Sequence, residues 1–525
     1  MVHHSNEPTS SGSLESLTVK ETNYTTKTPP KPLFSGKSEF CSWLLLCFTT
    51  GPVASMTRAY VPAAIQSLAL KLGRTSTGEL CSSTGNDCFV KFGVGKVHHT
   101  SYVLYLKSIY TAMEGLIALL VSGIADYSNY RKWFLIVSIM FYGLCALPFA
   151  GLTDATYAQL HTMSALYGLL NITNGVYQII EASYIPLFMR AKGMEIKHEE
   201  KGKDAEVLRR EIVLRRGSKV SVLGLLAGNL GGVIALVTGI IISYTRGGPA
   251  IDGFHNFLLA ITIAGCVTAS STLVAVLFIP SVEGKSKPVD GIFILLLTFK
   301  RMWSLLKQIR QYPNAFLLCI SWVIWNVTYT NFLSVFILLF RSTLGIGTTD
   351  SEYTVYTWLS YVISSLGSLA WMFSYPHAGL KMKTWAYIFL AVSLFTNFWG
   401  TLGISNNTKI GFRHRWEFWA FDVLYSGSSS ALRSLNRVLY STLLPEGDEA
   451  QFFGLEVLLG VAIGWIGDLV NATIQDRTGI DRMPFVPNTL LVLVSLVLYI
   501  LCDTEKGMAD AQKLLIQAQV SESTV

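Results

Sequence analysis

The sequence predicts an all-α polytopic membrane protein with about twelve transmembrane helices, and two properties of the chain lead to that class. Of its 525 residues, 51% are hydrophobic and only 14% are charged, whereas about a quarter of the residues in ordinary soluble domains are charged. The apolar residues also gather in runs of about twenty, the length that a helix needs to cross a bilayer core about 30 Å thick. A water-soluble fold is therefore excluded, as are collagen-like, disordered and disulfide-scaffold proteins.

Twelve apolar runs are the expected spans, and polar tails flank them. The runs are residues 40–70, 101–125, 133–152, 157–189, 220–244, 254–280, 314–340, 353–375, 384–404, 416–444, 452–474 and 485–502. Residues 1–38 are polar and carry too little apolar surface to fold, so we expect a disordered tail there. Residues 504–525 are expected to form a second, cytosolic tail. Because no apolar stretch follows an opening basic cluster, no cleavable signal peptide is expected and the first span serves as its own insertion signal.

The distribution of basic residues predicts the orientation of the spans. If the N-terminus is cytosolic, the cytosolic segments hold 26 Lys and Arg residues and the opposite loops with their margins hold 12. Cytosolic loops of membrane proteins carry the excess of basic residues, so we expect both termini in the cytosol. The net charge of +7 then reflects loops that face the lipid bilayer and its anionic headgroups, and it requires no nucleic-acid partner.

Two long connections predict the domain organisation. Residues 190–219 are dense in charges of both signs, which suits an exposed cytosolic loop that is partly helical or mobile. Residues 281–312 separate spans one to six (39–280) from spans seven to twelve (313–503) and contain a basic amphipathic stretch, 292–309, typical of a helix in the membrane interface. A division into six plus six spans is typical of major facilitator transporters, in which two bundles rock about a site near the midplane.

The turn after the second span resembles a loop motif of major facilitators. Gly123 and Asp126 precede the basic pair Arg131 and Lys132, in place of the longer Gly-to-Asp spacing of the usual motif. A carboxylate at a helix end that faces bases across a short turn can hold one bundle conformation as a charge-assisted latch. The alternative is that the basic residues simply anchor a cytosolic turn.

Cysteine usage indicates one disulfide and no metal site. Six of the eight cysteines lie in or at apolar spans and are expected to be small core residues. Cys81 and Cys88 lie in the first non-cytosolic loop, where a disulfide forms if the compartment is oxidising, and two free thiols are the alternative. No His or further Cys stands at zinc-ligand spacing, and Asn406 begins an acceptor triplet for glycosylation close to the membrane.

Several segments of the chain together form a recognisable set: Tyr60-Val61-Pro62, the Cys81 to Cys88 loop, His414 to Glu417, and Arg437 to Ser441 running into Leu444, Pro445, Gly447, Glu449, Phe452 and Phe453. With these segments the chain resembles a family, the fungal autophagy-related vacuole effluxers, which are major-facilitator-type proteins associated with release of amino acids from the vacuole. The last segment is the most specific. The chain departs from the family pattern at Gly51, where an acidic residue is usual, and at Gly460-Val461, where an Asp-Lys pair is usual.

Charged residues inside the spans are the candidates for function, because each costs roughly 2.5 to 3.5 kcal/mol to insert at the bilayer centre. An amino-acid substrate needs a cation for its carboxylate and an anion for its ammonium, and Arg58 with Glu114 or Glu181 offers such a pair. Asn326 lies in a polar-aromatic run of span seven that could face the cavity. The alternative for these charges is pairing between helices or snorkelling to a membrane face, the role expected for Arg433, Arg437 and Glu456.

The resemblance implies a vacuolar membrane transporter that exports amino acids, neutral ones such as leucine, from the vacuole lumen to the cytosol by alternating access after autophagic degradation. Proton coupling through Glu114 or Glu181 is a further hypothesis. The alternatives are a membrane sensor or scaffold that kept the fold without transporting, and a transporter of another small solute. An enzyme is not expected, and no cofactor is implied, because no nucleophile with a paired base, metal-ligand cluster or phosphate loop emerges from the sequence.

Overall fold

The computed structural model describes most of the expected membrane domain. The described residues are 36–81, 88–125, 130–196, 203–245, 249–279, 281, 312–344, 351–405, 407–444, 449–478 and 480–510. Several predicted features fall outside them: residues 1–35 of the N-terminal tail, the amphipathic stretch 292–309, the C-terminal tail beyond residue 510, and Asp126, Asn406, Pro445 and Gly447.

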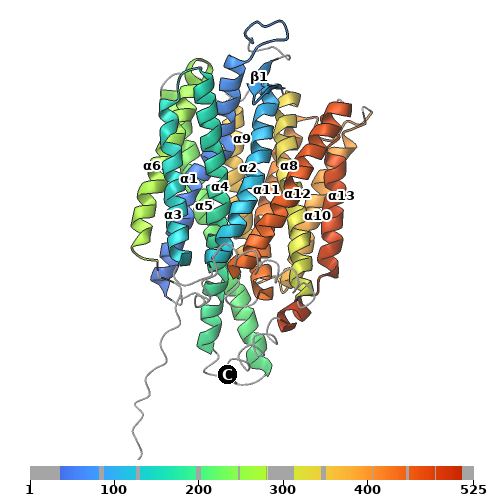
Figure 1. Cartoon of the computed structure of the whole chain (residues 1–525). Helices are drawn as coiled ribbons and strands as arrows, with labels where there is room; N and C mark the ends of the chain where they lie inside the picture. Colours follow the sequence, from blue (N-terminus) through green and yellow to red (C-terminus); the bar gives the residue numbers. More distant parts are fainter. Residues whose placement is uncertain are drawn as a thin grey trace, which may run out of the picture.

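The described residues contain twelve long helices that run side by side (Figure 1). In the first half they are α1 (Lys37–Leu72), α2 (His99–Ala125), α3 (Tyr130–Ala146), α4 (Tyr157–Ile196), α5 (Lys203–Thr245) and α6 (Pro249–Val276). In the second half they are α8 (Pro313–Leu344), α9 (Ser351–Ser374), α10 (Met382–Leu402), α11 (Arg415–Leu443), α12 (Glu449–Thr478) and α13 (Phe485–Leu501). The all-α fold is as predicted, and each helix overlaps one of the twelve expected spans.

Not every helix of the bundle is apolar throughout. By length and composition alone, six of the described helices could cross a membrane, or seven if α13 and the short helix Thr504–Asp510, bent from it by 57°, form one span. Helix α11 shows why others fall short, since it carries Glu417, Asp422, Arg433 and Arg437 within 29 residues. Such a helix is stable in a membrane when its polar face is turned toward the bundle interior.

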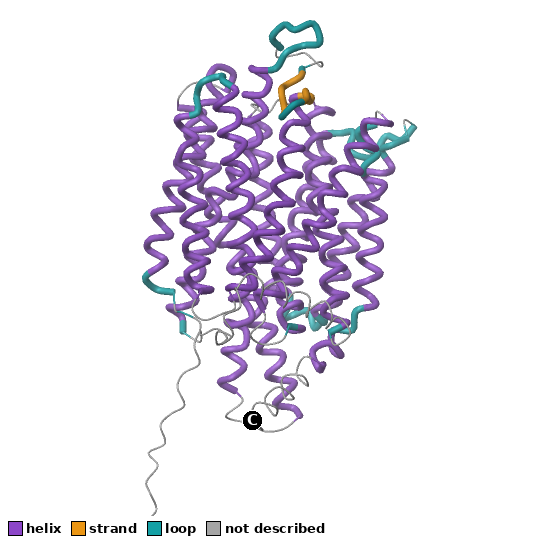
Figure 2. Tube along the Cα trace, in the orientation of Figure 1, coloured by secondary structure: helices purple, strands orange, loops and turns teal. Residues whose placement is uncertain are grey.

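The two ends of the bundle differ, and we name them by their residues. The end where α1 begins at Lys37 and α13 ends at Leu501 is the terminal face, and the opposite end, with Cys81 and Cys88, is the disulfide face (Figure 2). Helices α4 and α5 extend beyond the other helices at the terminal face (Figure 1). Because α4 continues to Ile196 and α5 begins at Lys203, most of the charged segment 190–219 is helical.

A small β-hairpin lies at the disulfide face. Strand β1 (Phe89–Phe92) pairs antiparallel with β2 (Gly95–His98), and Gly93 in the turn between them has a φ of 57°. Glycine adopts this left-handed backbone conformation without steric cost, and two-residue hairpin turns require it. The sequence prediction did not include this hairpin.

Small residues set the closest approach between helices. A Cβ atom on Gly51 of α1 would overlap the carbonyl oxygen of Gly228 in α5, and Gly224 of α5 packs on the ring of Trp43. Glycines allow such close crossings in membranes, where packing rather than the hydrophobic effect holds helices together. These glycines of α5 therefore pack against α1.

Two hydrogen bonds join the two halves of the chain near the terminal face. The Arg190 guanidinium of α4 donates a hydrogen bond of 2.8 Å to the carbonyl oxygen of Leu444, just beyond α11. The Ser221 hydroxyl of α5 donates one of 2.9 Å to the Ser434 carbonyl of α11. An arginine at a helix C-terminus satisfies carbonyls that lack a partner within the helix. Arg190 thus caps a helix of the opposite bundle and links the two halves at the terminal face.

An ion pair beyond α13 also lies at the terminal face. The Lys381 ammonium donates a 2.9 Å hydrogen bond to the Glu505 carboxylate and lowers the pKa of that carboxyl. Both side chains are exposed, so solvent screening limits the contribution of the pair to stability.

Candidate functional site

A cavity of about 100 Å³ lies between the two halves of the bundle. Five helices line it, namely α1 and α5 from the first half and α8, α9 and α11 from the second. The lining residues are Arg58, Leu225, Asn229, Tyr329, Leu333, Ile337, Tyr356, Thr357, Ser360, Tyr361, Ser364, Asp422, Ser426, Ser430 and Arg433. Since one water-sized group needs roughly 10 to 15 Å³ by this measure, the cavity holds several such groups.

Helical periodicity places the polar lining on single faces of two helices. On α11 the residues Asp422, Ser426, Ser430 and Arg433 follow one another at intervals of four, four and three, the spacing of one helix face. From the start of α11 at the disulfide face, this stripe extends from about 10 Å to about 27 Å along the axis at 1.5 Å per residue. The cavity therefore extends from the disulfide-face half toward the middle of the bundle.

Asp422 forms the acidic end of the cavity. Its carboxylate accepts hydrogen bonds from the Ser360 hydroxyl at 2.9 Å and from the Ser426 hydroxyl at 2.8 Å. Only 3% of Asp422 is exposed. In the part of the chain that the structure describes, no basic side chain forms a salt bridge with it. The carboxyl group is thus held in place by neutral hydroxyls.

Arg58 and Arg433 form the basic end. The guanidinium of Arg58 lies 5.9 Å from the ring centroid of Tyr361, and that of Arg433 lies 5.6 Å from the ring centroid of Tyr329. Aromatic faces attract a cation at such distances without neutralising it. Arg58 is exposed where it lines the cavity, and Arg433 is half-buried. Among the described residues Arg58 has no carboxylate within salt-bridge distance.

A second charged cluster lies one helical turn further toward the terminal face. Arg437 of α11 interacts electrostatically with Glu181 of α4 and with Glu456 of α12. Glu181 also contacts the thiol of Cys47, and Glu456 accepts a 2.6 Å hydrogen bond from the Trp322 indole. Arg437 therefore has carboxylate neighbours from both halves of the chain, in contrast to Arg58.

The structure separates the residues that the sequence analysis grouped as a substrate or proton pathway. Arg58 lines the cavity, whereas Asn326 is half-buried on α8 about one turn from a lining residue. Glu114 interacts with Asn174 and packs against Gly175 of α4, and Glu181 belongs to the second cluster. Neither glutamate is among the lining residues.

The structure places one residue where the sequence analysis did not expect it. Arg433 was expected to pair with a neighbouring helix or to snorkel to a membrane face, but it lines the same cavity as Arg58. Asp422, for which the sequence analysis proposed no role, is the acidic member of the lining. Both residues belong to the polar stripe of α11, whose regular spacing was the signal that could have identified them.

The remaining motif residues lie at the terminal face. Gly123 is in the last turns of α2, Arg131 is buried at the start of α3, and the Lys132 ammonium lies 5.9 Å from the ring centroid of Trp133. Glu449 begins α12. The ring of Phe452 packs on Tyr312 and Phe316, and the ring of Phe453 packs on Tyr440. The hydroxyl of Tyr440 also donates to the carbonyl of Phe452, which ties α11 to α12.

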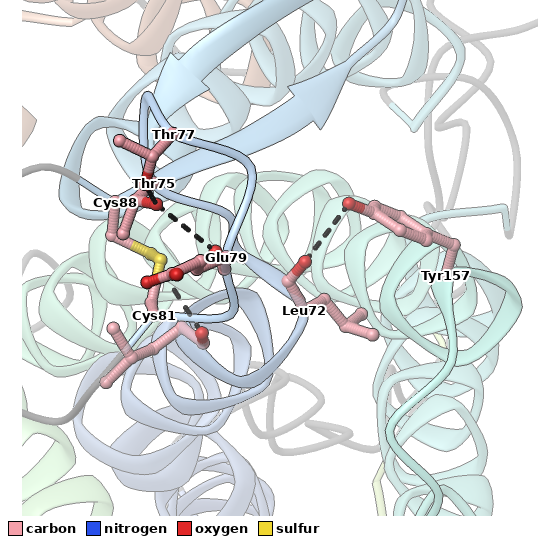
Figure 3. The surroundings of a disulfide bond; sticks show 8 residues. Leu72, Thr75, Thr77, Glu79, Cys81, Cys88 and Tyr157 are labelled. Carbon is pink, nitrogen blue, oxygen red and sulfur yellow. Dashed lines mark hydrogen bonds between the residues drawn. A yellow bond between two sulfur atoms is a disulfide. The ribbon is translucent and has the colours of Figure 1, made fainter.

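Cys81 and Cys88 form a disulfide at the end of α1 (Figure 3). It packs directly on Gly73, the residue that ends α1, where a Cβ atom would overlap the Cys88 sulfur. Close by, the Tyr157 hydroxyl of α4 donates a 3.3 Å hydrogen bond to the Leu72 carbonyl (Figure 3). Among the described residues no group of three or more His, Cys, Asp or Glu side chains could hold a metal ion.

The sequence of the chain matches one family of known proteins. The profile of the family described as "Vacuole effluxer Atg22 like" matches residues 35–512. The chain is 58% identical over 478 residues to the Autophagy-related protein 22 of Candida albicans, which covers 91% of this chain and 92% of that one. It is 22% identical over 541 residues to the protein of the same name from Saccharomyces cerevisiae, and the match covers 96% of this chain and 97% of that one.

Solved structures of major facilitator transporters share the fold. The human organic anion transporter MFSD10 superposes with a TM-score of 0.59 at 13% identity and covers 90% of this chain and 100% of its own. The transporter FucP superposes with a TM-score of 0.56 at 13% identity, and the match covers 88% of this chain and 98% of FucP. At these identities the likeness shows the arrangement of helices alone.

Proposed function

The chain belongs to the Atg22-like family of vacuole effluxers, transporters of the major facilitator fold, and we propose on this premise that it exports amino acids from the vacuole lumen to the cytosol. Neutral amino acids with an apolar side chain, such as leucine, suit the cavity best. In the proposed orientation both termini are cytosolic. The disulfide face then meets the lumen, the side on which a persistent disulfide calls for oxidising conditions.

The observation that carries this proposal is the separation of charge within one cavity. Asp422 and Arg433 lie eleven residues apart on α11, about 16 Å along the helix axis. Both residues line the same cavity, so that a solute inside it meets an acidic group at one end and basic groups at the other. The ammonium of an amino acid would bind the Asp422 carboxylate, and its carboxylate would bind the guanidinium groups of Arg58 and Arg433.

The lining between the two charged ends supports an apolar side chain on the substrate. Leu225, Leu333 and Ile337 contribute apolar surface, and Tyr329 and Tyr361 contribute ring faces. A pocket of mostly apolar surface with a few placed polar groups is the usual design of a small-molecule site. A second ionisable group on the substrate would have to be desolvated against this surface, which favours neutral amino acids.

The contacts between the bundles support transport by alternating access. The Arg190 and Ser221 hydrogen bonds join the halves near the terminal face, while the cavity extends through the disulfide-face half. Rocking of the bundles about the cavity would exchange these contacts for new ones at the disulfide face. The solute would then leave on the cytosolic side.

Proton coupling is part of the same proposal, with Glu181 as the favoured proton carrier. Its carboxylate is half-buried in α4 and interacts with Arg437 of the opposite bundle. Protonation would remove an attraction between the bundles, which is the coupling that a proton-driven transporter needs. Glu114 is the alternative carrier, but the partners of Glu114 that we identify, Asn174 and Lys107, lie within the first half of the chain.

The test is flux of labelled leucine across proteoliposomes that contain the purified full chain. The wild type should give flux above empty vesicles, and Arg58→Ala should abolish it without loss of folded protein. Arg215→Gln serves as the matched control, because Arg215 is exposed and pairs with Glu211 on α5 outside the cavity. Retained flux in Arg58→Ala would refute the substrate site, and absence of flux over a broad amino-acid panel would favour a sensor or scaffold.

A further inference from the structure

Two guanidinium groups from opposite bundles face one cavity. Arg58 belongs to α1 in the first half of the chain and Arg433 to α11 in the second, and both are lining residues. Arg433 lies within electrostatic range of Arg58 and of Arg437. Each of the two lining arginines rests on a tyrosine ring. The two bundles therefore present like charges to each other at the basic end of the cavity.

The carboxylates beside this arginine pair offset it only in part. Glu456 interacts with Arg433 and with Arg437, and Glu181 interacts with Arg437. Three arginines, Arg58, Arg433 and Arg437, thus stand beside these two glutamates. Asp422 stands about 16 Å along the helix axis from Arg433 and is bound by serine hydroxyls. The other groups that act on Arg58 are tyrosines, namely Tyr142, Tyr177, Tyr329 and Tyr361.

Repulsion between like charges grows as water leaves the space between them, because the effective dielectric falls. Closing the disulfide face over an empty cavity would bring the two bundles together around exposed positive charge. An anion bound between both guanidinium groups would reverse the sign of this interaction. Arginine is suited to that role because its planar donors bind a carboxylate in a bidentate manner.

We propose that Arg58 and Arg433 form one carboxylate-binding site shared by the two bundles, and that a bound carboxylate is what permits the disulfide face to close. The empty transporter stays open at the disulfide face because the two arginines repel each other. A solute with a carboxylate bridges them and closes the bundles, so only a loaded cavity is carried across. This inference deepens the proposed function, but it requires only that the solute carries a carboxylate.

The experiment measures the distance between the bundles at the disulfide face of the full chain in lipid nanodiscs. Spin labels are placed at Thr153→Cys in the first half and Lys409→Cys in the second, both exposed positions. The exposed cysteines Cys41 and Cys266 are replaced by serine, and electron–electron double resonance reports the open and closed populations. The probes are leucine, leucinamide, which lacks the carboxylate, and 4-methylpentanoate, which lacks the ammonium.

Leucine and 4-methylpentanoate should shift the ratio of open to closed molecules by at least about fivefold, the lower end of typical allosteric coupling, and leucinamide should not. Arg58→Gln and Arg433→Gln should each close the disulfide face without any solute, because either change removes the repulsion. Arg433→Lys keeps the charge and should stay open, as should the control Arg215→Gln.

Two results would overturn the inference: closure by leucinamide equal to that by leucine, or glutamine variants that remain open when empty. The glutamine variants are compared with the wild type without solute, so the result of that comparison does not depend on the identity of the substrate. If leucine and 4-methylpentanoate both fail while a different carboxylate such as succinate closes the wild type, the proposed amino-acid substrate is wrong and the arginine site stands.

Discussion

Replacing Gly51 by alanine tests the closest helix contact in the structure. A Cβ atom on Gly51 would overlap the carbonyl oxygen of Gly228 and lie 2.8 Å from the amide nitrogen of Gly232, both in α5. These are backbone atoms, so no side-chain rotation can relieve the overlap. Helices α1 and α5 must move apart, which also loosens their packing on either side of the crossing.

The expected cost follows from that geometry. Overpacking a well-packed interior costs about 1 to 3 kcal/mol and occasionally more, and immovable neighbours favour the upper end, so we expect about 3 kcal/mol for Gly51→Ala. The matched control is Gly460→Ala in α12, where a Cβ atom meets nothing within 4 Å. That change should be neutral or should stabilise the helix by about 0.5 to 1 kcal/mol, since glycine is a poor helix former.

The assay is reversible unfolding of the purified chain in mixed detergent micelles, followed by tryptophan fluorescence, with the folded yield from size-exclusion chromatography. The double variant should show the sum of the two effects, because the two sites lie in different helices and a Cβ atom at Gly460 touches no neighbour of Gly51. If Gly51→Ala and Gly460→Ala proved equally stable, α1 and α5 would not approach as closely as the structure has them.

Three further predictions concern a second crossing, the disulfide and the cavity. Gly367→Ala should lower the free energy of unfolding by about 1 to 3 kcal/mol, because its Cβ atom would overlap the Gly427 backbone. Gly427→Ala should be tolerated, since the nearest atom to its Cβ would lie 3.7 Å away. The same unfolding assay compares the two variants. Replacing Cys81 and Cys88 by serine should cost roughly 2.5 kcal/mol from loop entropy, seen as a lower melting temperature that reductant no longer changes. Asp422→Asn should lower leucine flux at least about tenfold through loss of the ammonium partner, with an unchanged folded yield, while closure by 4-methylpentanoate persists.

Much of the fold could be predicted because the membrane imposes it locally. A span must bury about twenty apolar residues whatever its neighbours are, so α10 (Met382–Leu402) and α13 (Phe485–Leu501) lie within a few residues of the expected runs. The extensions of α4 and α5 were harder to predict, since mixed charges favour an exposed loop and a solvated helix equally. The Arg215–Glu211 pair, at a spacing of four residues, was the local sign of a helix.

The site could be predicted only in part because it depends on which helix faces meet. Arg58 stood out as a lone charge in an otherwise apolar span, and it does line the cavity. Its partners could not be chosen by the same rule, because Glu114, Glu181, Asp422 and Arg433 carry equal insertion costs. Their neighbours separate them: Glu181 lies with Arg437, while Asp422 and Arg433 line the cavity.

The two positions at which the sequence analysis expected a departure from the family pattern lie at helix crossings. Gly51 lies at the crossing of α1 with α5, and Val461 packs against Gly115 at the crossing of α2 with α12. An acidic side chain at Gly51 would meet the backbone of α5 rather than the cavity. Neither position is among the lining residues, so the proposed transport does not rest on a charge at either of them.

The charges that remain in the cavity favour a transporter over a scaffold. Asp422 and Arg58 each carry the cost of a charge within the membrane, roughly 2.5 to 3.5 kcal/mol, and in the described part of the chain neither forms a salt bridge that would offset it. A scaffold would be more stable with apolar residues at both positions, since well-packed apolar groups often outperform buried charges. Inside the shared cavity, hydroxyls hold Asp422 in place and a tyrosine ring holds Arg58, but neither residue has a partner of opposite charge. A transporter needs this arrangement, because the solute that it carries supplies the missing partners.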